Sequence, residues 1–291
     1  MRIAMLQGPA ATDLDGSLAE VGEAARSASL ADAAMLVCAE LTCTGYRLPL
    51  VAEPMPDDGH RGRIGATMRN HAREFGIAIA YGYAEAREPL PGGGSAVHNS
   101  VAVVDPDGRI LAHYRKTHLY RPPASRRRSG VPDDSPFTPG DVLVEQFVFD
   151  GLTIGVLICY DVEFPEAVRA HAIAGADCLL VPTALAESDS LVATSLVPAR
   201  AVESQLFIAY VNRAGCDDRA SGGPDARYCG LTCAIAPDGT ELSRAGSKPE
   251  LLFADVDPGV LAASRRRNTY LRDLRPDLYA QSPMHRRTET S

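Results

Sequence analysis

Short apolar runs alternate with longer amphipathic segments along most of the chain. Apolar runs of about four to eight residues are typical of buried strands, whereas apolar positions three and four apart indicate helices. The pattern predicts strands over residues 3–6, 35–38, 77–83, 100–104, 152–159, 178–181, 207–211, 230–236 and 251–256. It predicts helices over residues 17–33, 62–75, 164–174, 197–205 and 258–267. Such an alternation of strands and helices indicates a layered α/β fold with a mixed sheet.

Turn signals and one irregular segment complete the pattern. Asp-, Pro- and Gly-rich turns at 105–108 and 237–239 each separate two strand-like runs, so both predict β-hairpins. Residues 121–139 have no hydrophobic period and predict a long loop, of the kind that forms a lid or binding loop. Because strand-like segments continue on both sides of that loop, we expect a single domain over residues 1–280, followed by a polar tail over residues 281–291.

Composition and charge exclude several classes of protein. Of the 291 residues, 45% are hydrophobic and 23% charged, which argues against intrinsic disorder. The formal net charge is −8, which makes a nucleic-acid or anionic-membrane partner unfavourable. No apolar run reaches the roughly 18–20 residues of a membrane span, and the chain turns polar at Gln7, too early for the apolar core of a signal peptide. We therefore expect a cytoplasmic protein that binds neither nucleic acid nor a membrane.

The cysteines favour nucleophilic over structural chemistry. Their number is odd and none forms a C-x-x-C pair, so without a secretory signal we expect no disulfide framework. No histidine lies at ligand spacing from a pair of cysteines, so we expect no metal site. The seven are Cys38, Cys43, Cys159, Cys178, Cys216, Cys229 and Cys233.

Three residues of different chemistry each follow an apolar run. Cys159 lies between the apolar run 154–158 and a helix that begins near Pro165, a turn at which backbone N–H groups lower the pKa of a thiol. Glu40 follows the run 35–38, where partial desolvation suits a carboxylate to general-base chemistry. Lys116 ends another strand-like segment and supplies a compact charge. Taken one at a time, these residues could equally be a buried structural cysteine, a solvated loop glutamate and a surface lysine. Taken together, they provide a nucleophile, a base and a cation.

Three segments around these residues resemble motifs of the nitrilase (carbon–nitrogen hydrolase) superfamily. They are 39–46 (AELTCTGY), 114–119 (YRKTHL) and 157–166 (LICYDVEFPE), and each contains one member of the family's Glu–Lys–Cys triad, in the family's order. Further similarity at 180–183, 199–203, 228–230 and 275–279 extends the resemblance from residue 1 to about residue 280. The resemblance implies a four-layer αββα sandwich, and subunits that pair into homodimers or higher homo-oligomers.

The resemblance also implies a reaction and its residues. Cys159 would be the nucleophile, Glu40 the base, and Lys116 the group that stabilises the oxyanion with the backbone N–H of Tyr160. Tyr46, in the glutamate motif, would contribute to substrate binding. The implied reaction is hydrolysis of a small carboxamide through a thioester on Cys159, with neither a metal nor an organic cofactor. The sequence leaves open whether the triad is neutral or ionised, because neighbouring groups titrate as a set.

A second carboxylate is implied by the same resemblance. Many members place another glutamate in the loop after the lysine, and counting back from Pro139 puts that position on Asp133. Asp133 would orient Lys116 or a substrate ammonium group. Because the loop is longer than in comparable members, Asp134 is an alternative, and an exposed loop pair without a role in the reaction is another.

The residues after Cys159 bear on the substrate. Tyr160 stands where nitrilase-branch members usually have tryptophan, and the segment resembles stereoselective amidases acting on amino-acid amides and cyclic-amine carboxamides. Glu163 stands where relatives that act on dicarboxylic half-amides hold an arginine, which pairs with carboxylates. If Glu163 faces the pocket, it favours an amine-bearing substrate; if it faces solvent, it says nothing about specificity. N-carbamoyl hydrolysis, acyl transfer to an amine, and a non-catalytic assembly protein are the alternative functions, and the intact triad argues against the last.

Overall fold

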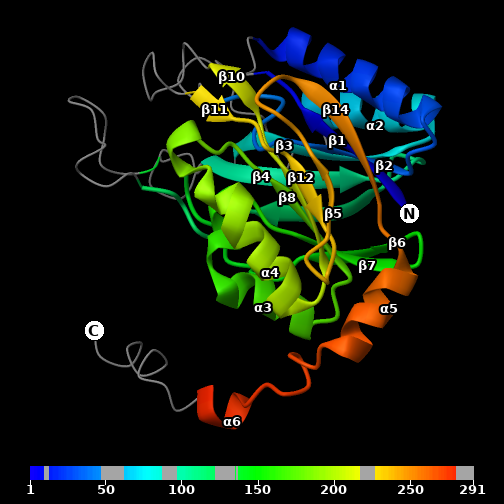
Figure 1. Cartoon of the computed structure of the whole chain (residues 1–291). Helices are drawn as coiled ribbons and strands as arrows, with labels where there is room; N and C mark the ends of the chain where they lie inside the picture. Colours follow the sequence, from blue (N-terminus) through cyan, green and yellow to red (C-terminus); the bar gives the residue numbers. More distant parts are fainter. Residues whose placement is uncertain are drawn as a thin grey trace.

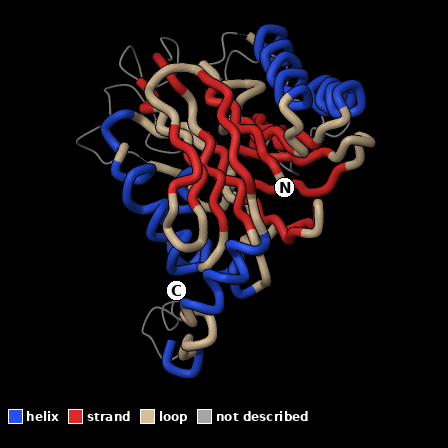
Figure 2. The backbone as a smooth tube through the Cα atoms, turned by 45° about the vertical axis from the view of Figure 1, so that its right-hand side comes forward, coloured by secondary structure: helices blue, strands red, loops and turns tan. Residues whose placement is uncertain are grey.

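Two sheets pack face to face, and helices cover both outer faces (Figures 1 and 2). The computed structural model describes residues 1–9, 13–46, 62–86, 97–121, 135, 137–216 and 227–279. The first sheet has the order β14 (Glu250–Asp255), β1 (Arg2–Gln7), β2 (Met35–Cys38), β3 (Ala78–Ala86), β4 (Val97–Val104) and β5 (Ile110–Arg115). The second has the order β13 (Glu241–Arg244), β12 (Cys233–Ile235), β9 (Phe207–Val211), β8 (Cys178–Pro182), β7 (Leu152–Val156) and β6 (Gln146–Phe149). The expected four-layer αββα sandwich is confirmed.

The helices form the two outer layers. α1 (Leu14–Leu30) and α2 (Arg63–Phe75) cover the first sheet, and α3 (Pro165–Ile173) and α4 (Val197–Ser204) cover the second (Figure 1). α5 (Pro258–Arg267) and the short α6 (Pro276–Tyr279) lead away from the sandwich (Figure 1). A small ribbon of β10 (Ala214–Cys216) and β11 (Arg227–Cys229) lies outside the two main sheets. Among the described residues, no helix combines the length and apolar character needed to cross a membrane.

The unbroken apolar runs follow from burial on both sides of each sheet. Along β2, Met35 and Val37 belong to the core between the sheets, whereas Leu36 and Cys38 belong to the core under α1 and α2. Because side chains alternate across a strand, a strand covered on both faces has few polar positions. The central parallel strands therefore appear in the sequence as continuous hydrophobic segments.

Most predicted elements are present, with differences at their ends. Both predicted hairpin turns join neighbouring antiparallel strands, β4 to β5 and β12 to β13. The strand expected over 152–159 ends at Val156, because the chain turns at Cys159 into a 3₁₀ helix, Cys159–Glu163. The strand expected over 230–236 contains only Cys233–Ile235, since Leu231 has a left-handed φ of 59°. Most of the predicted loop 121–139, and the tail 281–291, lie outside the described residues.

The topology brings particular strand ends together. β3, β5 and β2 run in one direction, and β7 and β8 run parallel to each other in the second sheet. Polar side chains cluster just past the carboxyl ends of these strands, the usual position of active sites in α/β proteins. β4 is antiparallel to its neighbours, so its amino-terminal end lies at this same edge.

Candidate active site

The Glu40 loop packs directly against a neighbouring strand. A Cβ atom added at Gly82, in β3, would lie 2.5 Å from the Leu41 nitrogen and 2.8 Å from the Ala39 carbonyl oxygen. Glycine is therefore required at position 82 for this close approach. Leu41 has a left-handed φ of 50°, a conformation that L-residues seldom adopt. The result is a tight turn that holds the Glu40 side chain fully buried.

Residues just past two strands of the second sheet hold the backbone of the Glu40 loop. The Arg213 Nε donates a 3.0 Å hydrogen bond to the Glu40 carbonyl oxygen, and its Nη2 donates to the Leu41 carbonyl oxygen. The Glu40 N–H donates to the carbonyl oxygen of Thr183, just past β8. Because each of these contacts joins the two sheets, sandwich packing fixes where the carboxylate lies.

Two donors share one oxygen of this carboxylate. The Lys116 Nζ lies 2.7 Å and the Asn99 Nδ2 2.6 Å from Glu40 Oε1. Glu40 Oε2 is buried and has no hydrogen-bond partner among the described residues. Burial alone would lower the pKa of Lys116, but the charge and hydrogen bond of Glu40 raise it above the ordinary lysine value. Lys116, only 3% exposed, is therefore a buried cation held against a buried carboxylate.

Cys159 stands at a strained turn between β7 and α3. Its φ of 48° is left-handed, and such strain in a non-glycine residue is common at functional sites. Asp161 holds the turn: its Oδ2 accepts a 3.0 Å hydrogen bond from the Ile158 N–H. Its Oδ1 accepts hydrogen bonds from the Thr117 hydroxyl and the His118 N–H, at 2.9 and 2.8 Å. This buried aspartate thus joins the cysteine turn to the segment that follows Lys116.

Burial dominates the titration of the Cys159 thiol. Burial raises the pKa of Cys159, the nearby Glu40 raises it further, and Lys116 and the Ala184 backbone oppose this shift. A backbone hydrogen bond from Ala184 does lower this pKa, but desolvation outweighs it, so the net shift of the Cys159 pKa is upward. A thiol with a raised pKa is protonated at neutral pH. It needs a base before it can attack.

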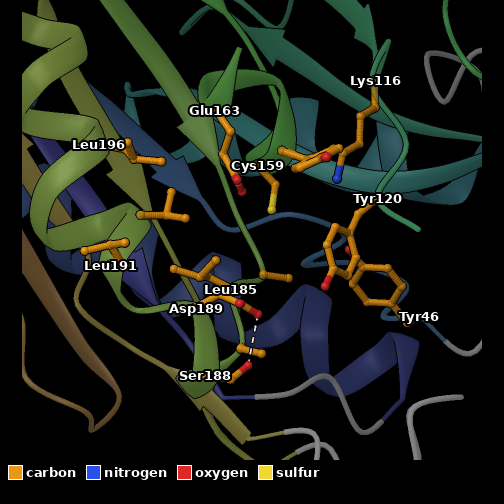
Figure 3. A pocket seen from close by; sticks show the side chains of 14 residues that line it. Tyr46, Lys116, Tyr120, Cys159, Glu163, Leu185, Ser188, Asp189, Leu191 and Leu196 are labelled. Atoms are coloured by element: carbon orange, nitrogen blue, oxygen red, sulfur yellow. Dashed lines mark hydrogen bonds between the residues drawn. The ribbon is translucent and has the colours of Figure 1, made fainter. Parts of the chain in front are cut away.

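A cavity of about 440 Å³ opens over these residues. Figure 3 shows Lys116 and Cys159 pointing into it, with the Tyr46 and Tyr120 rings together on one side. Leu191 and Leu196 lie on the opposite side, and Leu185 and Val192 also line the cavity, so much of its wall is apolar. Two of these leucines frame a π-helical turn, Val192–Leu196, of a kind often found at functional sites. The cavity has the size of a small-ligand pocket.

Acidic groups also line this cavity. Glu163 faces it, which resolves the question of orientation that the sequence leaves open, and Asp189 lies nearby on the wall (Figure 3). Burial raises the pKa of Glu163, the Asp189 charge raises it further, and Lys116 and Arg200 lower it. The Arg200 Nη2 donates a 2.7 Å hydrogen bond to the Glu163 carbonyl oxygen and so fixes this part of the chain.

Six of the seven predicted site residues lie around one space. Lys116, Cys159, Tyr46, Tyr160 and Glu163 line the cavity, and Glu40 lies behind Lys116. Asp133 and its alternative Asp134 lie outside the described residues, so the accessory role of Asp133 stays a prediction. In the described part of the chain, no group of three or more His, Cys, Asp or Glu side chains could hold a metal ion.

Sequence reasoning missed several residues that hold the site. They are Asn99, Asp161, Asp189, Arg200 and Arg213. Asn99 is a polar residue just before a predicted strand, and that position was the only local signal of its burial. Asp161 and Arg200 stand inside segments that resemble the family, but their partners are distant in sequence.

Comparisons with known proteins agree with this fold. Residues 2–266 match the carbon–nitrogen hydrolase family. An (R)-stereoselective amidase from a Pseudomonas species is 32% identical over 87% of this chain and 84% of its own length. The N-carbamoylputrescine amidase of Solanum lycopersicum is 29% identical over 95% of this chain and 93% of its own length.

A solved structure shows a similar fold with chemistry at its cysteine. The amidase from Nesterenkonia sp. AN1 matches with a TM-score of 0.78 and 31% identity, covering 97% of this chain and 99% of that one. That structure is of a glutamate-to-glutamine mutant, and it shows Michael addition of acrylamide at the active-site cysteine.

A buried carboxylate, a cation and a thiol around one cavity, in an αββα sandwich, define a hydrolase of carbon–nitrogen bonds. The chain belongs to the carbon–nitrogen hydrolase family. The expectation of an enzyme, in place of a non-catalytic assembly protein, is confirmed.

Proposed function

We propose that the protein is a cysteine-dependent amidase that converts a small carboxamide into a carboxylic acid and ammonia. One observation carries the proposal: the Cys159 thiol and the buried Lys116 line one cavity, and the fully buried Glu40 carboxylate binds that same lysine. That arrangement supplies a base, a nucleophile and a positive charge at one site.

The first half of the reaction forms a thioester. Glu40 accepts the thiol proton of Cys159, and Sγ attacks the amide carbonyl carbon. The carbonyl oxygen gains negative charge, which the Lys116 ammonium and the Tyr160 backbone N–H stabilise. Glu40 then returns the proton to the substrate nitrogen. The carbon–nitrogen bond breaks, and ammonia leaves.

The second half releases the acid. Water replaces ammonia, and Glu40 removes a proton from it as the oxygen attacks the thioester carbon. The second tetrahedral intermediate places its negative oxygen against the same two donors. It collapses with cleavage of the carbon–sulfur bond, and the proton on Glu40 returns to the sulfur. No step needs a cofactor.

Ammonia release tests the proposal and its alternative. N-carbamoyl hydrolysis has its own support, because the similar Solanum lycopersicum protein is an N-carbamoylputrescine amidase. Purified enzyme is assayed with a panel of aliphatic, amino-acid and cyclic-amine carboxamides and with N-carbamoyl amines. Fast ammonia release from carboxamides, with slow release from N-carbamoyl amines, supports the proposed amidase activity. The reverse order identifies the carbamoyl alternative, and hydroxamate formation with hydroxylamine measures acyl transfer.

The cavity wall favours an amine-bearing substrate. Glu163 and Asp189 line the same space, and each raises the energetic cost of a second negative charge there. A protonated amine on the substrate neutralises that repulsion, whereas the free carboxylate of a dicarboxylic half-amide increases it. The substrate class we propose is therefore amino-acid amides and cyclic-amine carboxamides.

Substitution of Glu163 measures this preference. We expect wild type to have a higher kcat/KM for prolinamide than for succinamic acid, and Glu163→Gln to reduce that ratio several-fold. A partly exposed charge pair contributes about 0.2–1 kcal/mol, which corresponds to this modest effect. The raised pKa of Glu163 means that its charge is lost on acidification at a higher pH than for an ordinary glutamate. The preference should therefore fade as the pH falls, before it would for a solvated carboxylate.

Glu166→Gln is the matched control. Glu166 is an exposed glutamate in the first turn of α3, so the same net charge is removed outside the cavity. We expect this variant to keep the wild-type ratio. Preference of the wild type for succinamic acid, or an unchanged ratio in Glu163→Gln, would show that Glu163 does not select the substrate.

We further propose a cytoplasmic homodimer or higher homo-oligomer. All seven cysteines are free, as is usual in a reducing compartment. Tyr270, Leu278 and Tyr279 are about half exposed on the segment that leaves the sandwich with α5 and α6 (Figure 1). Size-exclusion chromatography with light scattering should give a mass of at least twice the 30.9 kDa of one chain. A single species with the mass of one chain would contradict the proposal.

A further inference from the structure

We propose that Asn99 is a positioning residue that selects which oxygen of Glu40 carries the proton during catalysis. The inference rests on the proposed role of Glu40 as the base. Asn99 Nδ2 lies 2.6 Å from Glu40 Oε1, and both side chains are buried. Since a carboxylate only accepts hydrogen bonds, the amide must present its nitrogen to it.

The sheet topology places Asn99 at the site. It is the third residue of β4, whose amino-terminal end lies beside the carboxyl ends of β3 and β5. The Asn99 carbonyl oxygen accepts a 2.9 Å hydrogen bond from the Lys116 N–H. One residue therefore fixes the backbone of the lysine and the side chain of the glutamate. The backbone of Asn99 is hydrogen-bonded within the sheet between β3 and β5, so its side-chain amide starts from a fixed position beside Glu40.

The two donors make the two carboxylate oxygens unequal. Lys116 and Asn99 both bind Oε1, which stabilises negative charge there and disfavours a proton on that atom. Oε2 is left as the oxygen that can accept a proton, and it is buried without a partner among the described residues. Without Asn99, Oε1 would keep Lys116 as its one donor, and the orientation of the carboxylate would be less firmly fixed.

Other charged and titratable groups also face this carboxylate. Lys116 comes from the end of β5, Cys159 from the turn after β7, and Tyr46 from the loop of Glu40 itself. Arg213, after β9, binds the carbonyl oxygen of Glu40. None of these groups is itself substituted in an Asn99 variant. A change in the pH profile of an Asn99 variant therefore reports on the lost hydrogen bond.

Asn99→Leu removes the donor with little change in side-chain size. A hydrogen bond to a charged group is lost, so we expect kcat to fall by about ten- to a hundredfold. KM should change little, because Asn99 is not among the residues that line the cavity. The acid limb of the kcat profile should move to higher pH by about one unit, since the anionic carboxylate has lost a stabilising donor. Asn99→Ser keeps a shorter donor and should show a smaller shift in the same direction.

Ser100→Ala is the matched control. Ser100 is the next residue in β4, its side chain points to the opposite face, and its hydroxyl donates a 2.7 Å hydrogen bond to another buried carboxylate, that of Glu85. We expect Ser100→Ala to lower Tm while leaving kcat and the acid limb as in wild type. The pair separates a role in catalysis from a role in sheet stability.

The outcomes are distinct. A wild-type kcat and acid limb in Asn99→Leu, or an equal change in Ser100→Ala, overturns the proposal, even if Tm falls. If Asn99→Leu does not fold, Asn99→Ser decides: a wild-type kcat and profile overturns the proposal, and a partial shift supports it. Cys159→Ala is assayed in parallel. Turnover that survives in Cys159→Ala overturns the proposed function itself, whereas an inactive Cys159→Ala with a neutral Asn99→Leu overturns only the role of Asn99.

Discussion

Cys159→Ala should abolish ammonia release while the protein still folds. The sulfur is the atom that we propose forms the thioester, and no other group in the cavity replaces it. Loss of a catalytic nucleophile costs about 10⁴-fold or more in kcat. Little volume is removed, so thermal unfolding should change by only a few degrees. Mass spectrometry of wild type stopped during turnover should show an acyl adduct on the peptide that contains Cys159, and Cys159→Ala should show none.

Cys178→Ala is the control for cysteine removal. Cys178 is fully buried at the start of β8 and lines no part of the cavity. Its replacement should lower the free energy of unfolding by about 1 kcal/mol, as is typical of core substitutions, and leave kcat near wild type. An active Cys159→Ala variant, or an acyl adduct on another cysteine, would show that the nucleophile has been assigned to the wrong residue.

Lys116→Arg should lower kcat by at least about a hundredfold, the scale of losing one oxyanion donor. The substitution keeps the positive charge but replaces a compact ammonium with a larger planar guanidinium. There is little room for it, because Lys116 is 3% exposed and its ammonium is held 2.7 Å from the buried Glu40 carboxylate. The comparison of kcat with KM shows whether the loss occurs in the chemical step.

The chain offers a direct control for this substitution. Lys248 is the only other lysine in the sequence and is exposed. Lys248→Arg makes the same chemical change outside the site, and its kcat should equal that of wild type. Near-normal activity in Lys116→Arg would show that a compact ammonium is not required at position 116, and the positioned role proposed for Lys116 would be wrong.

The sequence by itself determined the buried strands of the layered fold and the position of Cys159 and Glu40 at strand ends. A strand covered on both faces must be apolar throughout, so the runs at 35–38 and 178–181 predicted strands that the structure contains. Site residues that directly follow such runs, Glu40 and Cys159, could be found because a strand's end is a local feature. The resemblance to the family then added what no periodicity can show, that these residues and Lys116 belong together.

Only the tertiary structure decided which atoms meet. Asn99 lies 59 positions from Glu40 along the chain, and Arg213 lies 173 positions away, so no local pattern connects them. The orientation of Glu163 depended on how the turn after Cys159 packs. The sign of the shift in the Cys159 pKa depended on the balance between desolvation and neighbouring charges. Local propensity sets where elements begin and end, whereas burial, hydrogen-bond partners and the facing of side chains arise only when two sheets pack together.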